Sequence, residues 1–515
     1  MGTPREFDLI VIGSGPAGEK GAAQAAYFGK RVALIEREGP VELGGACTNT
    51  GTLPSKTLRE SALALTGMSS RGLEEAVLSL PRPFAASTLL HRERLIVERS
   101  RMRIRHNLDR HGVELFSGSA AFVDANTVRV RQGPRWHDNP HAPPGNHTES
   151  PADPVLAAPF VLLATGSRPR RPGWIPFNEP EIYDSDDILQ LTHIPETLLV
   201  LGSGVIAAEY ACMFAAIGTH VTLVDGRDRL LSFIDGELGE RFSDELERLG
   251  LWLRLGDAPV ACSVDAGTRV CTVRTQGGCE HTADAVLAAA GRTGNIEGMN
   301  LESIGIVPDA RGNLKVNEHF QTAAPHVYAA GDVIGIPALA STSMEQGRVA
   351  MCHAFGLSYK QRVSPVLPTG IYTIPEISYV GATEEELKTA GTDYLIGQAR
   401  MSDNARGEIL GQESGFLKLL FAPDKKILGV HMLGPSATEL IHIGQIAMLQ
   451  GATIDLFIDA VFNYPTLSEL YKYAAYDGLG AMARRAREQQ STPVAAPPAG
   501  VVPIAAAVPT AGATG

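Results

Sequence analysis

The stretch 7-FDLIVIGSGPAGEKGAAQAAYFGKRVALIE-36 decides the fold of its part of the chain. Its two apolar runs, FDLIVI and RVALIE, are continuous rather than alternating, which is typical of parallel strands buried on both faces. Gly13, Gly15 and Gly18 form G-x-G-x-x-G between the first run and an Ala-rich segment that reads as a helix. The first glycine permits a tight turn, the second lets the backbone approach a pyrophosphate, and the third lets the helix pack on the strand. The stretch therefore predicts a dinucleotide-binding βαβ unit.

A carboxylate completes this unit. Glu36 ends the second strand, 18 residues beyond Gly18, where an acidic side chain accepts hydrogen bonds from ribose hydroxyls. The helix N-terminus presents its partial positive charge to the phosphates. A glycine triplet alone also occurs in purely structural turns, but strand, helix and acidic residue together favour nucleotide binding.

The same order recurs in 197-TLLVLGSGVIAAEYACMFAAIGTHVTLVD-225. Gly202, Gly204 and Ala207 repeat the glycine pattern with alanine in the third place, which the fingerprint permits, and Asp225 ends the second strand. An internal repeat of a complete nucleotide-binding unit predicts that one chain binds two dinucleotides.

The end of the second unit carries signals for both nicotinamide nucleotides. An aspartate at position 225 favours a free 2′-hydroxyl, and hence NAD. The residues GRDR follow at once, and Arg227 or Arg229 could meet the 2′-phosphate of NADP. The alternative is that these arginines are solvated surface charges. We therefore expect a site that is compatible with both nucleotides.

The rest of the chain adds a third kind of domain. A length of 515 residues predicts about three domains. From about residue 366, GFLKLLF and KILGVHML alternate as antiparallel strands. The segment ATELIHIGQIAML then places Leu440, Ile441, Gly444 and Ala447 on one helical face. This pattern of antiparallel strands followed by an amphipathic helix predicts an α+β domain after the two α/β units.

Composition excludes several classes of function. The net charge is −12 and no basic tract occurs, so we expect no nucleic acid and no anionic membrane as a partner. Six cysteines without a C-x-x-C pair predict neither a disulfide scaffold nor a metal site. Cys262, Cys271 and Cys279 read as small apolar side chains among strands. The N-terminus lacks the pattern of a signal peptide, and prolines interrupt the apolar C-terminal tail, so a cytoplasmic protein is expected.

Further motifs resemble the flavoprotein disulfide reductases, which include dihydrolipoamide dehydrogenase and glutathione reductase. They are ATGSRP at 164–169, GRTGN at 291–295 and AAGDVIG at 329–335, and with the two units the resemblance covers about residues 6–486. It implies that the first unit binds FAD, the second binds NAD(P)H, and the third domain forms a homodimer. It also implies that Lys56 and Glu209 pair beside flavin N5. The implied FAD-binding residues are Gly13, Gly15, Gly18, Glu36, Gly45, Cys47, Thr165, Gly166, Gly331 and Asp332. The implied nicotinamide-nucleotide residues are Gly202, Gly204, Ala207, Asp225, Arg227 and Arg292.

The expected fold class is α/β, with two Rossmann-like dinucleotide-binding domains and a C-terminal α+β dimerisation domain. The expected boundaries are 1–190 for the first FAD-binding segment, with a loop insertion at about 133–156, 191–315 for the NAD(P)-binding domain, 316–365 for a central FAD-binding segment, 366–486 for the dimerisation domain and 487–515 for a disordered tail.

The chain departs from this family at two places where the disulfide chemistry belongs. In 43-LGGACTNTGTLPSK-56, Cys47 stands where the family has the first thiol of C-x-x-x-x-C, but Thr52 replaces the second. In 462-FNYPTLSEL-470, Tyr464 replaces the family's general-base histidine, while Glu469 is retained. A tyrosine is a poor base at pH 7 because its ordinary pKa is about 10. Loss of both groups with both nucleotide units intact indicates a different second substrate.

One branch of the family resembles the chain in these same places. The soluble pyridine nucleotide transhydrogenases share C-T-x-x-G-T, F-N-Y-P-T, the segment P-T-G-I-Y-T-I-P-E-I-S at 368–378 and Y-D-S-D at 183–186. The resemblance implies a Si-specific NAD(P)⁺ transhydrogenase that moves a hydride between NADPH and NAD⁺ through FAD. Since only one unit remains for both nicotinamides, a ping-pong sequence is expected. Cys47 is then a packing residue beside the flavin.

Two alternatives remain open from the sequence. The first is an NAD(P)H:quinone or diaphorase-type reductase, because a quinone acceptor also needs no thiol. The second is a nucleotide-sensing or interaction protein that keeps FAD for structure. The Lys56–Glu209 pair also has a plain reading, as an interdomain salt bridge.

Overall fold

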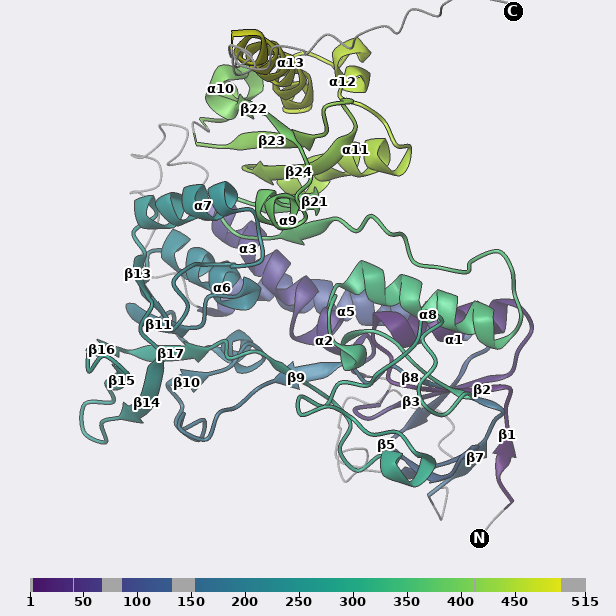
Figure 1. Cartoon of the computed structure of the whole chain (residues 1–515). Coiled ribbons are helices and arrows are strands. Elements are labelled where there is room, and N and C mark those ends of the chain that lie inside the picture. Colours follow the sequence, from purple (N-terminus) through teal and green to yellow (C-terminus); the bar gives the residue numbers. More distant parts are fainter. Residues whose placement is uncertain (1–2, 40, 67–85, 132–152, 412–413, 492–515) are drawn as a thin grey trace, which may run out of the picture.

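A computed structural model describes residues 3–39, 41–66, 86–131, 153–411 and 414–491. Figure 1 shows two α/β regions side by side, with a third region above them that contains the C-terminal helices. The three regions follow the predicted fold class. In the part of the chain that is described, no helix is both long and apolar enough to span a bilayer.

The first region is built on a five-stranded parallel sheet in the order β19-β8-β2-β3-β4. Its strands are β2 (Leu9–Ile12), β3 (Val32–Glu36), β4 (Glu114–Ser117), β8 (Phe160–Leu163) and β19 (Val327–Ala329). Helices α1 (Pro16–Tyr27) and α8 (Ala340–Ala354) pack on one face through alanines of α1. A second sheet, β1-β7-β6-β5, contributes side chains to the core on the other face. Its strands are β1 (Arg5–Glu6), β5 (Ser119–Asp124), β6 (Thr127–Arg131) and β7 (Val155–Ala157). Both faces are thus covered, which explains the continuous apolar runs.

Three further helices of the first region extend toward its neighbours. They are α2 (Gly45–Asn49), α3 (Thr52–Thr66) and α5 (Ala86–Arg110). Helix α3 lies beside α6 of the second region, as Figure 1 also shows. This contact brings the segment after Cys47 to the boundary between the two regions.

The second region repeats the arrangement with a parallel sheet in the order β10-β17-β11-β12-β13. Its strands are β10 (Ile182–Tyr183), β11 (Thr197–Leu201), β12 (His220–Asp225), β13 (Trp252–Leu255) and β17 (Ala285–Ala288), and its helices are α6 (Val205–Ala216) and α7 (Gly236–Arg248). A three-stranded antiparallel sheet joins it, made of β14 (Pro259–Val264), β15 (Cys271–Thr275) and β16 (Glu280–Ala283). Cys262 and Cys271 lie in these strands as expected, but Cys279 is exposed in the turn before β16, which corrects the prediction for that residue. Strands β9 (Ser167–Pro169) and β18 (Arg292–Gly294) pair across the boundary with the first region.

The third region is a five-stranded antiparallel sheet covered by helices. Its strand order is β20-β21-β24-β23-β22. The strands are β20 (Thr369–Ile371), β21 (Ile377–Gly381), β22 (Leu395–Arg400), β23 (Phe416–Phe421) and β24 (Ile427–Leu433), and the helices are α9 (Glu384–Thr389), α10 (Ala405–Leu410), α11 (Ala437–Leu449), α12 (Asp455–Asp459) and α13 (Glu469–Ser491). Helix α11 buries Ile441, Gly444 and Ala447, with Leu440 half-buried beside them, which confirms the predicted face.

Two predicted boundaries are wrong. Helix α13 continues to Ser491, so residues 487–491 belong to it rather than to the tail. Arg, Glu and Gln are good helix formers, so nothing in ARRAREQQ ends the helix early. The expected loop insertion at 133–156 ends too late, since β7 begins at Val155. The other residues of the predicted tail, and most of the predicted insertion, lie outside the described residues.

Candidate functional site

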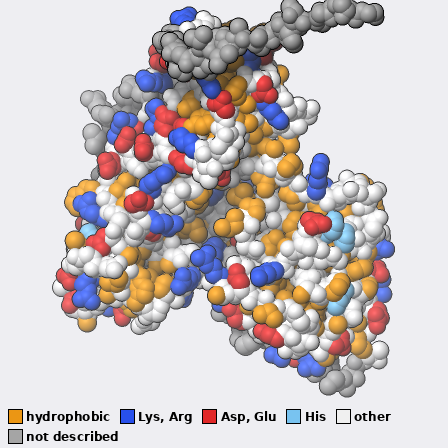
Figure 2. Space-filling model, in the orientation of Figure 1, with side chains coloured by type: hydrophobic (Ala, Val, Ile, Leu, Met, Phe, Trp, Pro, Cys, Tyr) orange, Lys and Arg blue, Asp and Glu red, His pale blue; other side chains and the backbone are white. Residues whose placement is uncertain are grey.

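A cleft of about 900 Å³ lies between the first and second regions and is bordered by part of the third. Figure 2 shows the surface deeply indented between the two α/β regions. The lining includes residues of α1, α2 and α3 of the first region, of α6 of the second, and of β20 with the residues on either side of it. Its volume is at the upper end of what ligand pockets in proteins have, so it can hold a large ligand.

Two glycines of the first unit make close backbone contacts, and the third leaves open space. Gly13 has a φ of +100°, and a Cβ there would lie 2.3 Å from the Ala164 carbonyl oxygen. A Cβ at Gly18 would lie 1.9 Å from the Gly13 carbonyl oxygen, so helix and turn touch directly. A Cβ at Gly15, by contrast, would meet nothing within 4 Å. Gly15 therefore leaves open space in the cleft at the start of α1, where the helix dipole favours an anion.

Glu36 lines the cleft at the end of β3 and is held there by Ser14. The Ser14 backbone N–H donates to Glu36 Oε2 at 2.9 Å, and the Ser14 hydroxyl donates to the same oxygen at 2.6 Å. The Gly44 N–H in turn donates to Ser14 Oγ at 2.9 Å. These bonds fix the carboxylate through Oε2, while Oε1 accepts only a long bond from the Glu38 N–H at 3.5 Å, so Oε1 keeps the capacity to accept from a ribose hydroxyl.

The opposite side of the cleft carries a chain of polar contacts that crosses into the second region. Asp332 accepts from the Ser167 hydroxyl at 2.9 Å. Arg292 donates from Nε to Ser167 Oγ at 2.8 Å and from Nη2 to the Ser167 carbonyl at 2.7 Å. The Thr165 hydroxyl, in the short connection between β8 and β9, is buried and has no hydrogen-bond partner. A buried hydroxyl without a partner in a cleft is a group that a ligand can satisfy.

Cys47 and Thr52 face each other on the cleft wall. Burial raises the pKa of the Cys47 thiol, and a side-chain hydrogen bond with Thr52 lowers it only in part. The thiol is therefore protonated at neutral pH, and a hydroxyl occupies the place from which a second thiol would react. A disulfide cannot form here.

Lys56 and Glu209 form a close ion pair across the boundary of the two regions. Lys56 Nζ lies 2.8 Å from Glu209 Oε1 and 2.6 Å from Oε2. The Glu209 side chain is only 5% exposed and that of Lys56 is 24% exposed, so the ammonium still faces the cleft. The pairing is as predicted. Its burial makes it stronger than a surface salt bridge, and it ties α3 to α6.

The glycines of the second unit are more loosely enclosed. Gly202 has a φ of +126°, and a Cβ there would lie 2.7 Å from the Ala289 carbonyl oxygen. A Cβ at Gly204 would meet nothing within 4 Å. Ala207 is fully buried and supplies the helix contact that Gly18 makes in the first unit. This turn again leaves open space at the start of a helix, α6.

Asp225, at the end of the second strand of this unit, is bonded to Arg227 two residues later. The Arg227 N–H donates to Asp225 Oδ1 at 2.7 Å, and its guanidinium donates to both carboxylate oxygens at 3.0 and 3.2 Å. Desolvation raises the pKa of Asp225, but the bonds from Arg227 outweigh it and the pKa is lowered. The Arg227 side chain is 52% exposed. The two groups that were expected to compete for the nucleotide thus neutralise each other.

Two further polar groups of this unit are buried without a close hydrogen bond. The Ser203 hydroxyl, the counterpart of Ser14 in the first unit, is fully buried and makes no close bond, but it faces Asp225 and helps to lower the pKa of that carboxyl. Nη2 of Arg229 is buried and unpaired, and it lies against the start of α7 near Gly236 and Gly239. Arg229 therefore points back into the fold, which makes Arg227 the exposed candidate for a phosphate contact.

The structure brings most of the predicted residues to the cleft. The lining includes Gly13, Gly15, Glu36, Gly45, Cys47, Lys56, Thr165, Gly166, Glu209, Arg292 and Asp332. Gly18 is buried beneath the lining, and the Gly331 N–H donates to the Gln346 side chain at 2.8 Å. Gly202, Gly204, Ala207, Asp225 and Arg227 lie outside the lining, in the second unit.

Sequence reasoning missed several residues of the cleft. Ser14 and Ser167 are short polar side chains inside motifs whose clearest signal is their glycines. Asp186 and Tyr372 belong to segments that resemble the transhydrogenase branch, and both line the cleft. Burial raises the pKa of Asp186, while Arg292, 3.9 Å away, lowers it in part. The signal for both residues was present in the quoted segments.

Tyr464 lies away from the cleft, on the surface of the third region. Its side chain is 73% exposed, and Val461 beside it is 94% exposed. Glu469 Oε2 is buried without a hydrogen-bond partner. An apolar, exposed segment next to an unpaired buried carboxylate oxygen is typical of a surface that another chain covers.

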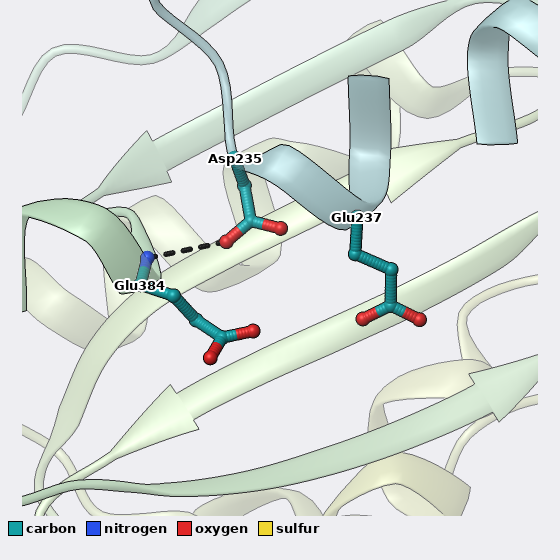
Figure 3. Close-up of side chains that lie close together, drawn as sticks. All are labelled: Asp235, Glu237 and Glu384. Atoms are coloured by element: carbon teal, nitrogen blue, oxygen red, sulfur yellow. Dashed lines mark hydrogen bonds between the residues drawn. The ribbon is translucent and has the colours of Figure 1, made fainter. Parts of the chain in front are cut away.

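Asp235, Glu237 and Glu384 form the single group of acidic side chains with metal-ligand spacing in the described part of the chain. Figure 3 shows the three carboxylates converging from α7 and α9. Lys418 Nζ lies among them, 2.8 Å from Asp235 and 3.1 Å from Glu237, and it also bonds Glu384. Burial lowers the pKa of Lys418, but these carboxylates outweigh it and the pKa is raised. The cluster is an ion-pair network between the second and third regions, with the lysine as its cation.

The cleft fits a flavin dinucleotide. It begins at the open glycine of a helix N-terminus, which suits a pyrophosphate, and it has a fixed carboxylate for a ribose and an unpaired buried hydroxyl. At its other end stand a buried thiol and a paired ammonium, which suit a ring system that gains and loses negative charge.

The comparisons with known proteins agree with this geometry. A family model described as pyridine nucleotide-disulphide oxidoreductase matches residues 7–347, and one described as the dimerisation domain of the same family matches residues 367–475. A protein named soluble pyridine nucleotide transhydrogenase from Mycobacterium bovis (strain BCG / Pasteur 1173P2) is 43% identical over 479 residues, covering 93% of this chain and 98% of the relative. A protein of the same name from Yersinia pestis (strain Pestoides F) is 42% identical over 477 residues, covering 92% of this chain and 98% of the relative.

A solved structure is similar as well. The Cu(II) complex of the HOCl-induced flavoprotein disulfide reductase RclA from Escherichia coli has a TM-score of 0.80 and 25% sequence identity. The match covers 92% of this chain and 99% of that one. The likeness extends through all three regions.

Proposed function

Because this chain belongs to the pyridine nucleotide-disulphide oxidoreductase family, we propose that it is an FAD-dependent transhydrogenase that acts without a redox-active disulfide. FAD, when bound, accepts a hydride from one nicotinamide nucleotide and passes it to the other. The substrates are NADPH and NAD⁺, with transfer in a ping-pong sequence and at the Si face. The names of the two relatives that match over nearly their whole length support this assignment.

The observation that carries the proposal is the pairing of Cys47 with Thr52 in an otherwise intact cleft. The thiol is protonated and has no second sulfur opposite it, so electrons cannot pass to a disulfide substrate. Hydride transfer between nicotinamides requires only that the rings be stacked and oriented, and it needs neither a thiol nor a base. The exposed Tyr464 in place of a histidine fits the same reaction.

The residues of the first unit would hold FAD. Gly13, Gly15 and Gly18 form the pyrophosphate turn, and Glu36 accepts from the ribose. Gly45, Cys47, Thr165, Gly166 and Asp332 form the remaining wall, and Gly331, with a φ of +80°, makes the turn that leads into Asp332. Lys56, held by Glu209, places a positive charge in the cleft, which stabilises an electron-rich reduced ring.

The residues of the second unit would hold each nicotinamide nucleotide in turn. Gly202, Gly204 and Ala207 receive the pyrophosphate at the start of α6. Asp225 accepts from a free 2′-hydroxyl, and Arg227 pairs with a 2′-phosphate. Arg292 joins the second unit to the FAD-side wall through Ser167.

We further propose a homodimer formed through the third region, and a cytoplasmic location. The match to a dimerisation domain and the exposed Val461 and Tyr464 support the dimer. The word soluble in the names of the relatives supports the location.

The test compares four acceptors on one preparation that has been reduced with NADPH. NAD⁺ or its thio-analogue should sustain turnover, whereas lipoamide and glutathione disulfide should give no turnover. If a soluble quinone gives faster turnover than NAD⁺, the protein is a quinone reductase and this proposal is wrong. Failure of every acceptor, with FAD still bound, would indicate a nucleotide-sensing protein.

A further inference from the structure

The loop of residues 372–376, between β20 and β21, is where the three regions of the chain meet. On one side it is fastened to α3 by Arg59, a buried arginine. Arg59 Nε donates to the Thr373 carbonyl at 2.8 Å, and its Nη2 lies 3.0 Å from Glu376 Oε1. Thr438 donates to the other oxygen of Glu376 from both its N–H, at 3.0 Å, and its hydroxyl, at 2.8 Å. The loop is therefore held rigidly against the first region.

On its other side the same loop is fastened to α6 of the second region. The Tyr372 N–H donates to Glu209 Oε1 at 2.9 Å. The Ile374 N–H donates to the sulfur of Cys212 at 3.1 Å, and Cys212 is itself buried. Glu209 thus receives a hydrogen bond from the third region and an ammonium from the first.

These anchors place the aromatic ring of Tyr372 against Lys56. Lys56 Nζ lies 4.8 Å from the centre of the Tyr372 ring, and both side chains line the cleft. A cation over the face of an aromatic ring is attracted by the ring's quadrupole, more strongly where water is partly excluded. The Tyr372 hydroxyl interacts with Thr438 rather than with the ion pair. The ring face, and not the hydroxyl, is what Tyr372 offers to Lys56.

Lys56 is a long side chain that would otherwise have considerable rotamer freedom. Glu209 holds the ammonium from one direction, and Lys56 Nζ makes a longer hydrogen bond to Ser55 Oγ at 3.3 Å. The ring adds a non-ionic contact on a further side, which holds the ammonium without placing a second carboxylate beside it.

We propose that Tyr372 is a positioning residue that holds Lys56 in the flavin cleft, so that the third region contributes to the redox properties of the cofactor. This rests on the proposed function only in that a flavin fills the cleft. The inference explains why a loop of the third region reaches down between the two nucleotide units. It assigns a role to the segment P-T-G-I-Y-T-I-P-E-I-S, whose tyrosine has no other contact with the ion pair than those given above.

The experiment measures the reduction potential of the bound flavin against a redox dye. In Tyr372→Leu the ring is lost, and the equilibrium constant for flavin reduction should fall about tenfold, equal to a shift of about 30 mV for a two-electron couple. Tyr372→Phe keeps the ring face and should stay within about twofold of the parent value. An unchanged potential in Tyr372→Leu, with flavin still bound, would overturn the inference.

Two further measurements guard against a merely structural effect. Phenylalanines with increasing fluorination at position 372 keep the shape of the ring while they weaken its quadrupole, so the potential should fall stepwise; a flat series would also overturn the inference. In a Lys56→Met background, Tyr372→Leu should have no further effect on the potential. Equal effects of Tyr372→Leu with and without Lys56 would show that the ring acts elsewhere.

The parent protein separates failure of this inference from failure of the proposed function. If the purified parent binds no flavin when FAD is supplied, the proposed function fails and the potential has no meaning. If the parent binds FAD and transfers hydride to NAD⁺ while the position-372 series is flat, only the inference fails.

Discussion

In the first nucleotide unit Ser14 donates to Glu36 from its N–H and its hydroxyl, whereas in the second unit the close hydrogen bonds to Asp225 come from the N–H and the guanidinium of Arg227. Strand, turn and helix are otherwise alike in the two units. The first acidic residue is fixed by the backbone and faces an enclosed cleft, while the second is bonded to an arginine that is half exposed. A fixed site suits a cofactor that stays bound. A site with an exchangeable internal ion pair suits two substrates that differ by one phosphate.

The largest loss of stability is expected when the ion-pair network between the second and third regions is broken. Lys418→Met leaves the three carboxylates of Asp235, Glu237 and Glu384 without their cation, and breaking a buried pair in this way costs about 3–5 kcal/mol. Thermal unfolding and hydrogen exchange should show α7 loosened while α1 is protected as before. Lys425→Met, which removes a half-exposed ion pair with Asp455 in the same region, is the matched control and should cost about 1 kcal/mol or less.

The dependence of folding stability on pH below about 4.5 tests the same ion-pair network. Desolvation raises the pKa of Glu384, but the bonds from Lys418, Tyr394 and Lys388 together outweigh it, and the pKa falls to about 2 from an ordinary value of 4.5. A lowered carboxyl pKa stabilises the fold above pH 4.5, and this stability is lost as the pH falls from there toward 2. In Lys418→Met the carboxylates favour protonation, so the variant should approach the parent in stability as the medium is acidified. A constant difference at all pH values would contradict this account.

The next prediction compares Gly18, which packs against the turn, with Gly15, which leaves room for the ligand. Gly18→Ala forces a Cβ to 1.9 Å from the Gly13 carbonyl, so the turn must shift, at a cost of about 3 kcal/mol, and FAD should be lost. Gly15→Ala meets nothing in the protein, so the fold should be kept while FAD affinity falls. Flavin content and circular dichroism measure the two quantities. Equal loss of folding in both variants would contradict the assigned roles.

The internal ion pair of the second unit should set the preference between nucleotides. Arg227→Ala should raise KM for NADPH by roughly 10- to 150-fold, the equivalent of about 1.5–3 kcal/mol for a charge-assisted contact, with little effect on NADH. Asp225→Ala should weaken NADH binding and leave NADPH binding unchanged or improved. Arg274→Ala, at an exposed position on β15 of the same region, is the control and should affect neither. If Arg227→Ala affects both nucleotides alike, Arg227 is a surface charge.

The smallest change is expected from restoring the missing sulfur. Thr52→Cys places a second thiol opposite Cys47, but Tyr464 still cannot act as a base, so lipoamide reduction should appear only weakly. Because burial raises the pKa of Cys47, the parent should alkylate slowly at pH 7 and faster as the pH rises. It should also show no long-wavelength thiolate band on partial reduction. Efficient disulfide reduction by the parent would be incompatible with this structure.

Much of the fold could be predicted because the information is local. The apolar runs and glycine turns specified both βαβ units, and the spacing of Ile441, Gly444 and Ala447 specified the buried face of α11. The Asp225–Arg227 pair could have been predicted too, since an aspartate readily accepts from the N–H two residues later in a turn. Tyr372 could not, because its contact with Lys56 depends on how segments more than 300 residues apart pack. The end of α13 was missed because good helix formers continue past the expected boundary.

The central claim is that NADPH and NAD⁺ use one site, the second unit, in turn. The first unit is assigned to FAD, and Cys47 and Thr52 fill the wall of the cleft where a second nicotinamide would need room. Initial rates with NADPH varied at several fixed NAD⁺ concentrations test this most directly. A single shared site gives parallel lines in double-reciprocal plots. Each nucleotide should also inhibit at high concentration, because it competes for the flavin form that the other nucleotide needs. Intersecting lines, which require both nucleotides bound at once, would contradict it.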